Sequence, residues 1–103
     1  MMWNREEAFL LMPKFEADAK FMGYHVALGG SVMYNGESNK DLDVIVYPHK
    51  DTDPNRPKPE LLMVLFRFHN LIDEYGDIAQ TKGMDRFVFS GTNKSRRIDF
   101  IFV

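Results

Sequence analysis

Apolar residues recur at helical spacing in the first part of the chain, directly after Asn4, which can cap a helix with Glu7 three residues later. These apolar residues are Phe9, Leu10, Met12, Phe15, Ala19 and Met22. Pro13 interrupts the pattern, and because proline lacks the N–H of the helical hydrogen bond, it is expected to kink the helix or split it. Gly23 suits the end of this predicted helix.

A second amphipathic pattern begins at Glu60, after a loop of proline and charged residues at 48–59. Its apolar positions lie three and four residues apart, and they are Leu61, Val64, Leu65, Phe68, Leu71, Ile72 and Tyr75. This spacing predicts a second helix that ends at Gly76. The polar residues 77–85 are expected to form a connection.

Four segments alternate or carry β-branched residues in the manner of strands, at 24–28, 41–47, 86–90 and 96–103. Gly91-Thr92-Asn93 is expected to supply a hairpin turn between the last two. This order of elements predicts an α+β fold, with a small mixed, mostly antiparallel four-stranded sheet and helices on one face. With 103 residues, the chain is expected to be a single domain, 1–103.

Composition excludes several kinds of site. The chain has no cysteine, which excludes disulfides and thiolate metal sites, and its net charge of −2 argues against general coating of nucleic acid. Without a membrane-length apolar stretch or a signal-peptide pattern, a cytoplasmic location with no membrane partner is expected. Basic residues of the last quarter would suit a polyanionic substrate; they are Lys82, Arg86, Lys94, Arg96 and Arg97.

Three aspartates lie in two strongly apolar predicted strands. Asp41 and Asp43 share one face of their strand because side chains alternate, and Asp99 shares a face with Arg97 in the last strand. If the two strands are neighbours, the three carboxylates gather on the face opposite the helices. Carboxylates removed from water need a partner, and oxygen ligands suit magnesium or manganese. We therefore expect a divalent metal site here, with solvated strand charges as the alternative.

Gly29, Gly30 and Ser31 follow the first predicted strand and form a candidate phosphate site. Glycine lets backbone amides approach an anion closely, and the serine hydroxyl can donate to a phosphate oxygen. Lys40 and Arg97 are further candidates for phosphate contact, with solvation or a surface ion pair as the alternative. Two metal ions together with a phosphate site are the parts needed for in-line displacement at phosphorus.

The order of Gly29-Gly30-Ser31, nine residues, Asp41-Leu42-Asp43 and a later Ile98-Asp99-Phe100 strand resembles the signature of the polymerase-beta-like nucleotidyltransferase superfamily. The similarity is greatest to its minimal, single-domain members from prokaryotes and phages. It implies a nucleotidyltransferase that moves a nucleoside monophosphate from a nucleoside triphosphate to a hydroxyl and releases pyrophosphate. The acceptor, whether a protein, an RNA or a small molecule, stays open.

The resemblance also implies roles for individual residues. Asp41 and Asp43 would hold two Mg²⁺ (or Mn²⁺) ions, and Asp99 would complete the catalytic metal and favour the attacking alkoxide. Gly29, Gly30 and Ser31 would hold the triphosphate.

Two departures from the family pattern affect the expected partners. Many minimal members carry an arginine soon after the serine, where this chain has Val32-Met33-Tyr34. Larger relatives add a C-terminal domain that grips the base and the acceptor, so a homodimer or a partner subunit is expected to complete the site. Two other readings stay open: a nucleotide-binding, weakly active or inactive module that acts through a partner protein, as antitoxin-type relatives do, and an α+β interaction domain without a ligand.

Overall fold

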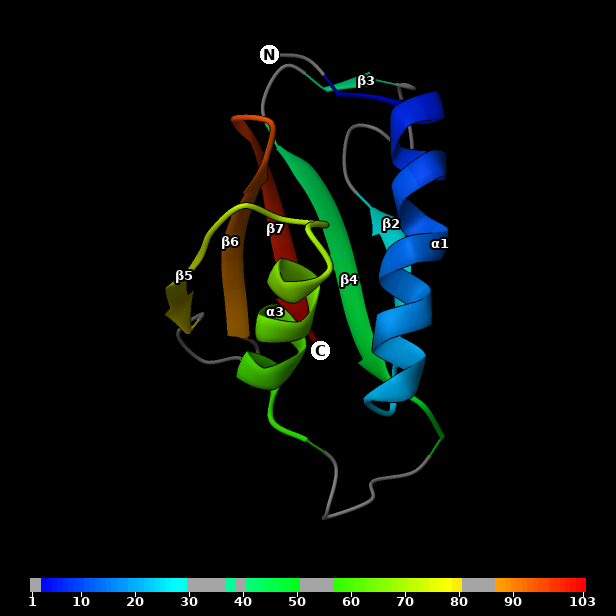
Figure 1. Cartoon of the computed structure of the whole chain (residues 1–103), viewed down its shortest axis with the longest axis vertical. Coiled ribbons are helices and arrows are strands. Elements are labelled where there is room, and N and C mark those ends of the chain that lie inside the picture. Colours follow the sequence, from blue (N-terminus) through cyan, green and yellow to red (C-terminus); the bar gives the residue numbers. More distant parts are fainter. Residues whose placement is uncertain (1–2, 30–36, 39–40, 51–56, 81–86) are drawn as a thin grey trace.

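The computed structural model describes residues 3–29, 37–38, 41–50, 57–80 and 87–103 (Figure 1). The helices are α1 (Arg5–Phe21) and α3 (Pro59–Phe68). The strands are β1 (Trp3–Asn4), β2 (Tyr24–Gly29), β3 (Glu37–Ser38), β4 (Leu42–Pro48), β5 (Tyr75–Gln80), β6 (Phe87–Asn93) and β7 (Arg96–Phe102). No helix within these ranges is long and apolar enough to cross a membrane.

The main sheet has five strands in the order β2-β4-β7-β6-β5, and β1 pairs separately with β3. Strands β4 and β7 are parallel, whereas the other neighbours in the main sheet are antiparallel. The predicted α+β class and the mixed, mostly antiparallel sheet are confirmed. The predicted number of four strands is wrong, because Tyr75–Gln80 forms β5 where a helix end and a polar connection were expected.

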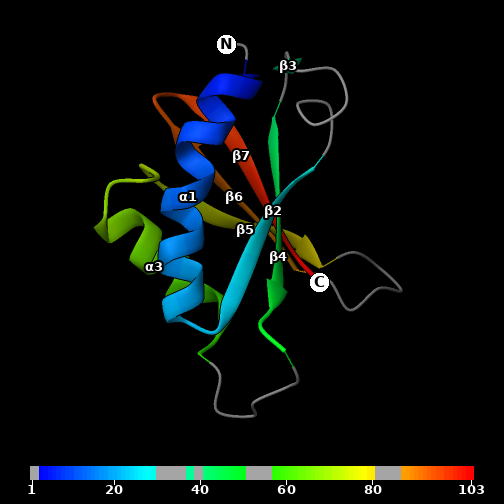
Figure 2. The same cartoon turned by 90° about the vertical axis from the view of Figure 1, so that its right-hand side faces the viewer.

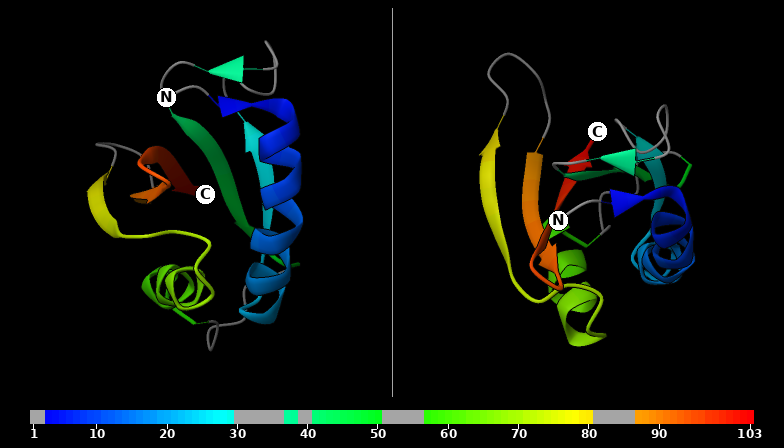
Figure 3. Two further views of the ribbon diagram at one scale, coloured as in Figure 1. Left: turned by 45° about the horizontal axis from the view of Figure 1, so that its top comes forward. Right: turned by 90° about the horizontal axis from the view of Figure 1, so that it is seen from above.

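Both helices cover the same face of the main sheet (Figures 2 and 3). Phe15 of α1, Phe66 of α3 and Phe100 of β7 meet with ring centroids 4.9 to 5.3 Å apart. These three rings are fully buried, which places the centre of the core between the helices and the parallel strand pair. Burial of large aromatic side chains of this kind is a principal source of stability in a domain of this size.

Helix α1 has the predicted ends. The side chain of Asn4 accepts a hydrogen bond from the Glu7 N–H at 2.9 Å, and Gly23, with a φ of 83°, follows the C-terminus. The helix is not split at Pro13, which lies within one continuous element. Phe9 and Leu10, predicted on the apolar stripe, are instead exposed.

Helix α3 is shorter than the sequence predicted. It ends at Phe68, and Asn70 then adopts a φ of 59°, a left-handed conformation that stops a helix. Leu71 and Ile72 bury their side chains from the irregular segment that follows, so their helical spacing was coincidental. The chain then enters β5, which makes Gly76 a strand residue and not a helix end.

The hairpin turn also differs from its predicted position. Lys94 and Ser95 connect β6 to β7 with φ values of 52° and 67°, the signature of a two-residue type I′ turn. Gly91, predicted in the turn, lies inside β6 opposite Ile98. A Cβ at Gly91 would lie 3.1 Å from the Glu74 carbonyl oxygen, so glycine is needed there for close strand approach.

Trp3 anchors the N-terminus to the start of β7, a contact that the sequence did not reveal. Its side chain is fully buried, and its indole N–H donates to the Arg97 carbonyl oxygen at 3.0 Å. The Arg96 guanidinium lies over the indole ring, 3.9 Å from the centroid. This anchor fixes the backbone beside the candidate site on β7.

Candidate active site

The predicted aspartates share the face of the sheet that the helices leave uncovered. Asp43 pairs directly with Asp99 across the parallel β4–β7 ladder. The alternate residues of these strands are the buried ones, namely Leu42, Val44, Val46, Ile98, Phe100 and Phe102. Because alternate side chains point to opposite faces, both aspartates project to the uncovered face, hereafter the open face. The predicted pairing of the two acidic strands is therefore confirmed.

Strand register places the aspartates in one row across the open face. Gly29 pairs with Asp43, Asp43 with Asp99, and Asp99 with Ser90. Neighbouring strands lie about 4.8 Å apart, so the row steps from β2 to β6 at that interval. Gly29 thus marks the β2 side of the aspartates. The other predicted phosphate-binding residues on this side, Gly30, Ser31 and Lys40, lie outside the described residues.

Arg97 joins two of the three carboxylates. Its Nε donates to Asp99 Oδ1 at 3.0 Å and lies 3.7 Å from Asp41 Oδ2. The Arg97 side chain is 48% exposed, whereas that of Asp99 is 16% exposed and that of Asp41 is 32% exposed. Asp41, which directly precedes β4, therefore lies close to the Asp99 carboxylate, as alternation predicted.

The charges of this site oppose one another. Burial raises the pKa of Asp43, and the negative charge of Asp41 raises it further. Burial also raises the pKa of Asp99, although the hydrogen bond and the charge of Arg97 act in the opposite direction. The pKa of Arg97 is raised in turn, chiefly by its hydrogen bond to Asp99. Both carboxyl groups are therefore harder to ionise than usual, chiefly because they are partly buried, and for Asp99 this holds even beside the Arg97 guanidinium.

The donor chemistry fits a hard divalent cation. Asp41, Asp43 and Asp99 offer only carboxylate oxygens, the ligands that magnesium and manganese prefer, and an added cation would relieve their mutual repulsion. In the described part of the chain, however, no three acidic, histidine or cysteine side chains are arranged to hold an ion as they stand. Asp99 is instead hydrogen bonded to Arg97. Metal binding would therefore require these side chains to reorient.

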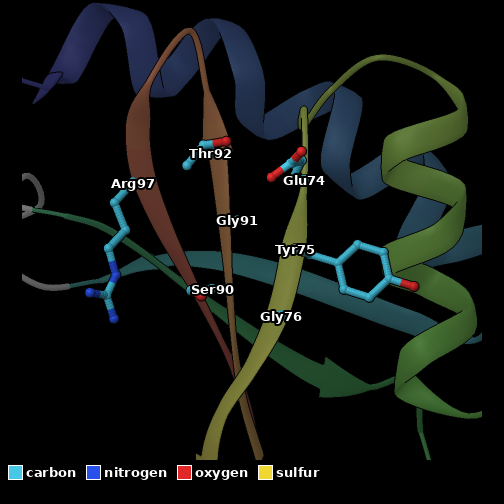
Figure 4. A pocket seen from close by; sticks show the side chains of 7 residues that line it. All are labelled: Glu74, Tyr75, Gly76, Ser90, Gly91, Thr92 and Arg97. Carbon is cyan, nitrogen blue, oxygen red and sulfur yellow. The ribbon is translucent and has the colours of Figure 1, made fainter.

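An open pocket of about 520 Å³ lies on the β5–β6 side of Arg97 (Figure 4). By strand register this is the end of the row opposite Gly29. The pocket's lining residues are Glu74, Tyr75, Gly76, Ser90, Gly91, Thr92 and Arg97. Ser90 pairs with Asp99 and Thr92 with Arg97, so their hydroxyl-bearing side chains share the open face with the carboxylates. The sequence did not reveal this pocket, because its outer wall depends on β5, which had been interpreted as helix and connection.

Comparison with known proteins supports the fold. No protein-family model and no curated protein matches the chain. Among solved structures, the chain is similar to one described as the polymerase core of TRAMP, an RNA surveillance complex, with a TM-score of 0.71 and 14% sequence identity. The similarity covers 95% of this chain, which spans 31% of that solved chain. The predicted α+β fold is thus shared with a solved polymerase core.

Proposed function

We propose that this protein is a metal-dependent nucleotidyltransferase that moves a nucleoside monophosphate from a nucleoside triphosphate to a hydroxyl acceptor and releases pyrophosphate. The observation that carries the proposal is the register pairing of Asp43 with Asp99 on adjacent parallel strands, with Asp41 beside them on the open face. The fold shared with a polymerase core supports the same class of reaction. The nucleoside triphosphate substrate, the dependence on metal and the hydroxyl acceptor all belong to this proposal.

The three aspartates of the open face have defined roles in this proposal. Asp41, Asp43 and Asp99 would hold two Mg²⁺ or Mn²⁺ ions, which when bound supply positive charge to the phosphates. The acceptor oxygen forms a bond to the α-phosphorus, the bond to the bridging oxygen of the β-phosphate breaks, and pyrophosphate leaves. The hydroxyl proton passes to an Asp99 carboxylate oxygen, which lies on the open face beside the other two carboxylates.

The layout of the open face supports one direction for the reaction. In-line displacement requires the acceptor and the leaving pyrophosphate on opposite sides of the α-phosphorus. Gly29 lies beyond Asp43 on the β2 side, and the pocket lies beyond Asp99 on the β6 side. We therefore place the triphosphate toward Gly29 and toward Gly30 and Ser31, which follow it in the sequence. The acceptor hydroxyl then enters from the pocket, past Ser90 and Thr92.

Transfer of labelled nucleotide tests the proposal. The protein is incubated with each α-labelled nucleoside triphosphate, Mg²⁺ or Mn²⁺, and acceptors of three kinds: protein, RNA and small hydroxyl compounds. Label is expected on one acceptor, and Asp43→Asn is expected to lower the rate on the order of a hundredfold or more. Glu60→Gln, at an exposed position on α3, removes one negative charge away from the site and should leave the rate unchanged. Equal rates for the wild type and Asp43→Asn would refute the assignment.

A second candidate is a nucleotide-binding module with little or no activity that acts through a partner subunit. The contacts of Arg97 with both Asp41 and Asp99 favour it, because a guanidinium there neutralises carboxylates that metal ions would otherwise engage. Nucleotide binding without transfer to any acceptor would support this candidate over the enzyme.

A further inference from the structure

A second polar cluster lies at the other end of the open face. His25 of β2 pairs with Tyr47, two rungs beyond the Ala27–Ile45 pair and four residues from Gly29, so it lies about 13 Å along the strand from the aspartate row. His49 follows β4 directly, and its Nδ1 is in hydrogen-bond contact with His25 Nε2. The two imidazole rings have centroids 4.6 Å apart. Neither histidine has a role in the proposed transfer.

Glu16 of α1 contacts both the His25 side chain and the backbone of β2. One of its oxygens accepts the backbone N–H of Val26 at 2.9 Å, and the other lies 2.7 Å from His25 Nδ1. Glu16 therefore caps an N–H at the free edge of the sheet and also favours the proton on His25 Nδ1. With that proton in place, the Nε2 of a neutral His25 carries a lone pair directed toward His49.

His49 is positioned by the backbone. Its N–H donates to the Gly23 carbonyl oxygen at 2.9 Å, which ties the end of β4 to the turn after α1. The His49 side chain is exposed, and that of His25 is 23% exposed. Two imidazole nitrogens thus converge at a surface position, one of them braced by a carboxylate.

We propose that His25 Nε2 and His49 Nδ1 bind a divalent transition metal of the zinc or nickel type. Imidazole nitrogen suits these metals. In many such sites a carboxylate accepts the other ring N–H of the ligating histidine and so fixes the orientation of the ring. The ion separates the two nitrogens, so the imidazole rings move apart on binding. Water completes the coordination, since the site faces solvent. The carboxylate row takes hard cations instead, so the two sites differ in metal preference.

Zn²⁺ titration by calorimetry at pH 7.5 tests the site, in an Asp43→Asn background that weakens the carboxylate row. His25→Gln and His49→Gln are each expected to lower Zn²⁺ affinity on the order of tenfold or more, and Glu16→Gln about tenfold through the lost support. The matched control is His69→Gln, because His69 pairs with Asp18 on the helical side and glutamine can still donate to that carboxylate. This control should bind Zn²⁺ as tightly as the background.

Long-range ¹H–¹⁵N spectra test the site in the wild-type protein. This test therefore does not depend on whether a variant folds. On Zn²⁺ addition, the His25 Nε2 and His49 Nδ1 resonances should shift together while those of His69 stay in place. The alternative is a plain hydrogen bond in which His49 Nδ1–H donates to His25. Unshifted nitrogens, or equal Zn²⁺ affinity in His25→Gln and its background, would establish that alternative and overturn the metal site.

Discussion

The two faces of strands β4 and β7 are built from the same residues taken alternately, yet they differ completely in environment. On the helical face, Val44 and Phe100 are fully buried among apolar neighbours. On the open face, Asp43 and Asp99 stay partly exposed, and burial raises the pKa of each. The helical face stabilises the fold, whereas the open face holds like charges that oppose it. Such opposition is common where side chains serve binding or catalysis rather than packing.

The largest effect should come from truncation on the helical face. Phe100→Ala removes a ring that contacts both Phe15 and Phe66, and it should lower the free energy of unfolding by about 3–5 kcal/mol. The matched control is Ile101→Ala, one residue along β7 on the open face, where the side chain is half-buried and less is lost. Urea unfolding measures both. Equal losses would contradict the contrast between the faces.

The next effect concerns a carboxylate on the helical side that has its own partner. Both oxygens of Asp18 lie within 2.9 Å of His69 Nδ1, and Asp18 is the only buried charged residue in the described part of the chain. His69→Ala leaves this carboxylate without that partner and should cost about 1–3 kcal/mol in urea unfolding. In Asp18→Asn, the added His69→Ala change should cost less, because no buried charge is then stranded. A full loss in that background would exclude the pairing as the cause.

Alternation explains why the sequence predicted the faces but not the edges of the sheet. Within β4 and β7, the residues on either side of Asp43 and Asp99 are all apolar, so the two aspartates in the sequence mark which face is buried. Asp43 and Asp99 come together only if β4 and β7 are neighbouring strands. The sequence prediction depended on that pairing, and the structure shows it. Arg97, predicted on the same face, contacts Asp99 for the same reason.

The missed features depend on contacts between distant segments. Tyr75 has helical spacing from Leu71, but it lies in β5 because the chain turns at Asn70 and pairs with β6. The pocket beside Ser90 follows from that pairing and has no local signal. Likewise, nothing near Trp3 in the sequence indicates its hydrogen bond to the Arg97 carbonyl. Long-range packing overrides local pattern at each of these positions.

A smaller effect should appear when one charge is removed from the open face. Because the pKa of Asp43 is raised in the folded state, its contribution to stability is complete below the ordinary value of 3.8 and is lost as pH rises through the folded pKa. Asp43→Asn cannot ionise. Relative to the wild type it should therefore gain stability as pH rises above about 4, with a plateau once the wild-type group is ionised.

Urea unfolding in EDTA at a series of pH values measures this difference between Asp43→Asn and the wild type. Mn²⁺ in place of EDTA should stabilise the wild type more than the variant, because only the wild type keeps all three proposed ligands. A difference that does not change with pH would mean that Asp43 is solvated as an ordinary strand charge. Equal stabilisation by Mn²⁺ would remove Asp43 from the proposed metal ligands.

The smallest change in stability should follow from Arg97→Gln, although its effect on the site is specific. The ion pairs of Arg97 are half-exposed, and pairs of this kind contribute only about 0–1 kcal/mol. The hydrogen bond and charge of Arg97 nevertheless lower the pKa of Asp99 against the effect of burial, so the variant should titrate Asp99 at higher pH. Carboxyl ¹³C NMR measures that shift, with Arg67→Gln on α3 as the control that should leave Asp99 unchanged. An unshifted Asp99 in Arg97→Gln would mean that the guanidinium does not hold this carboxylate in solution.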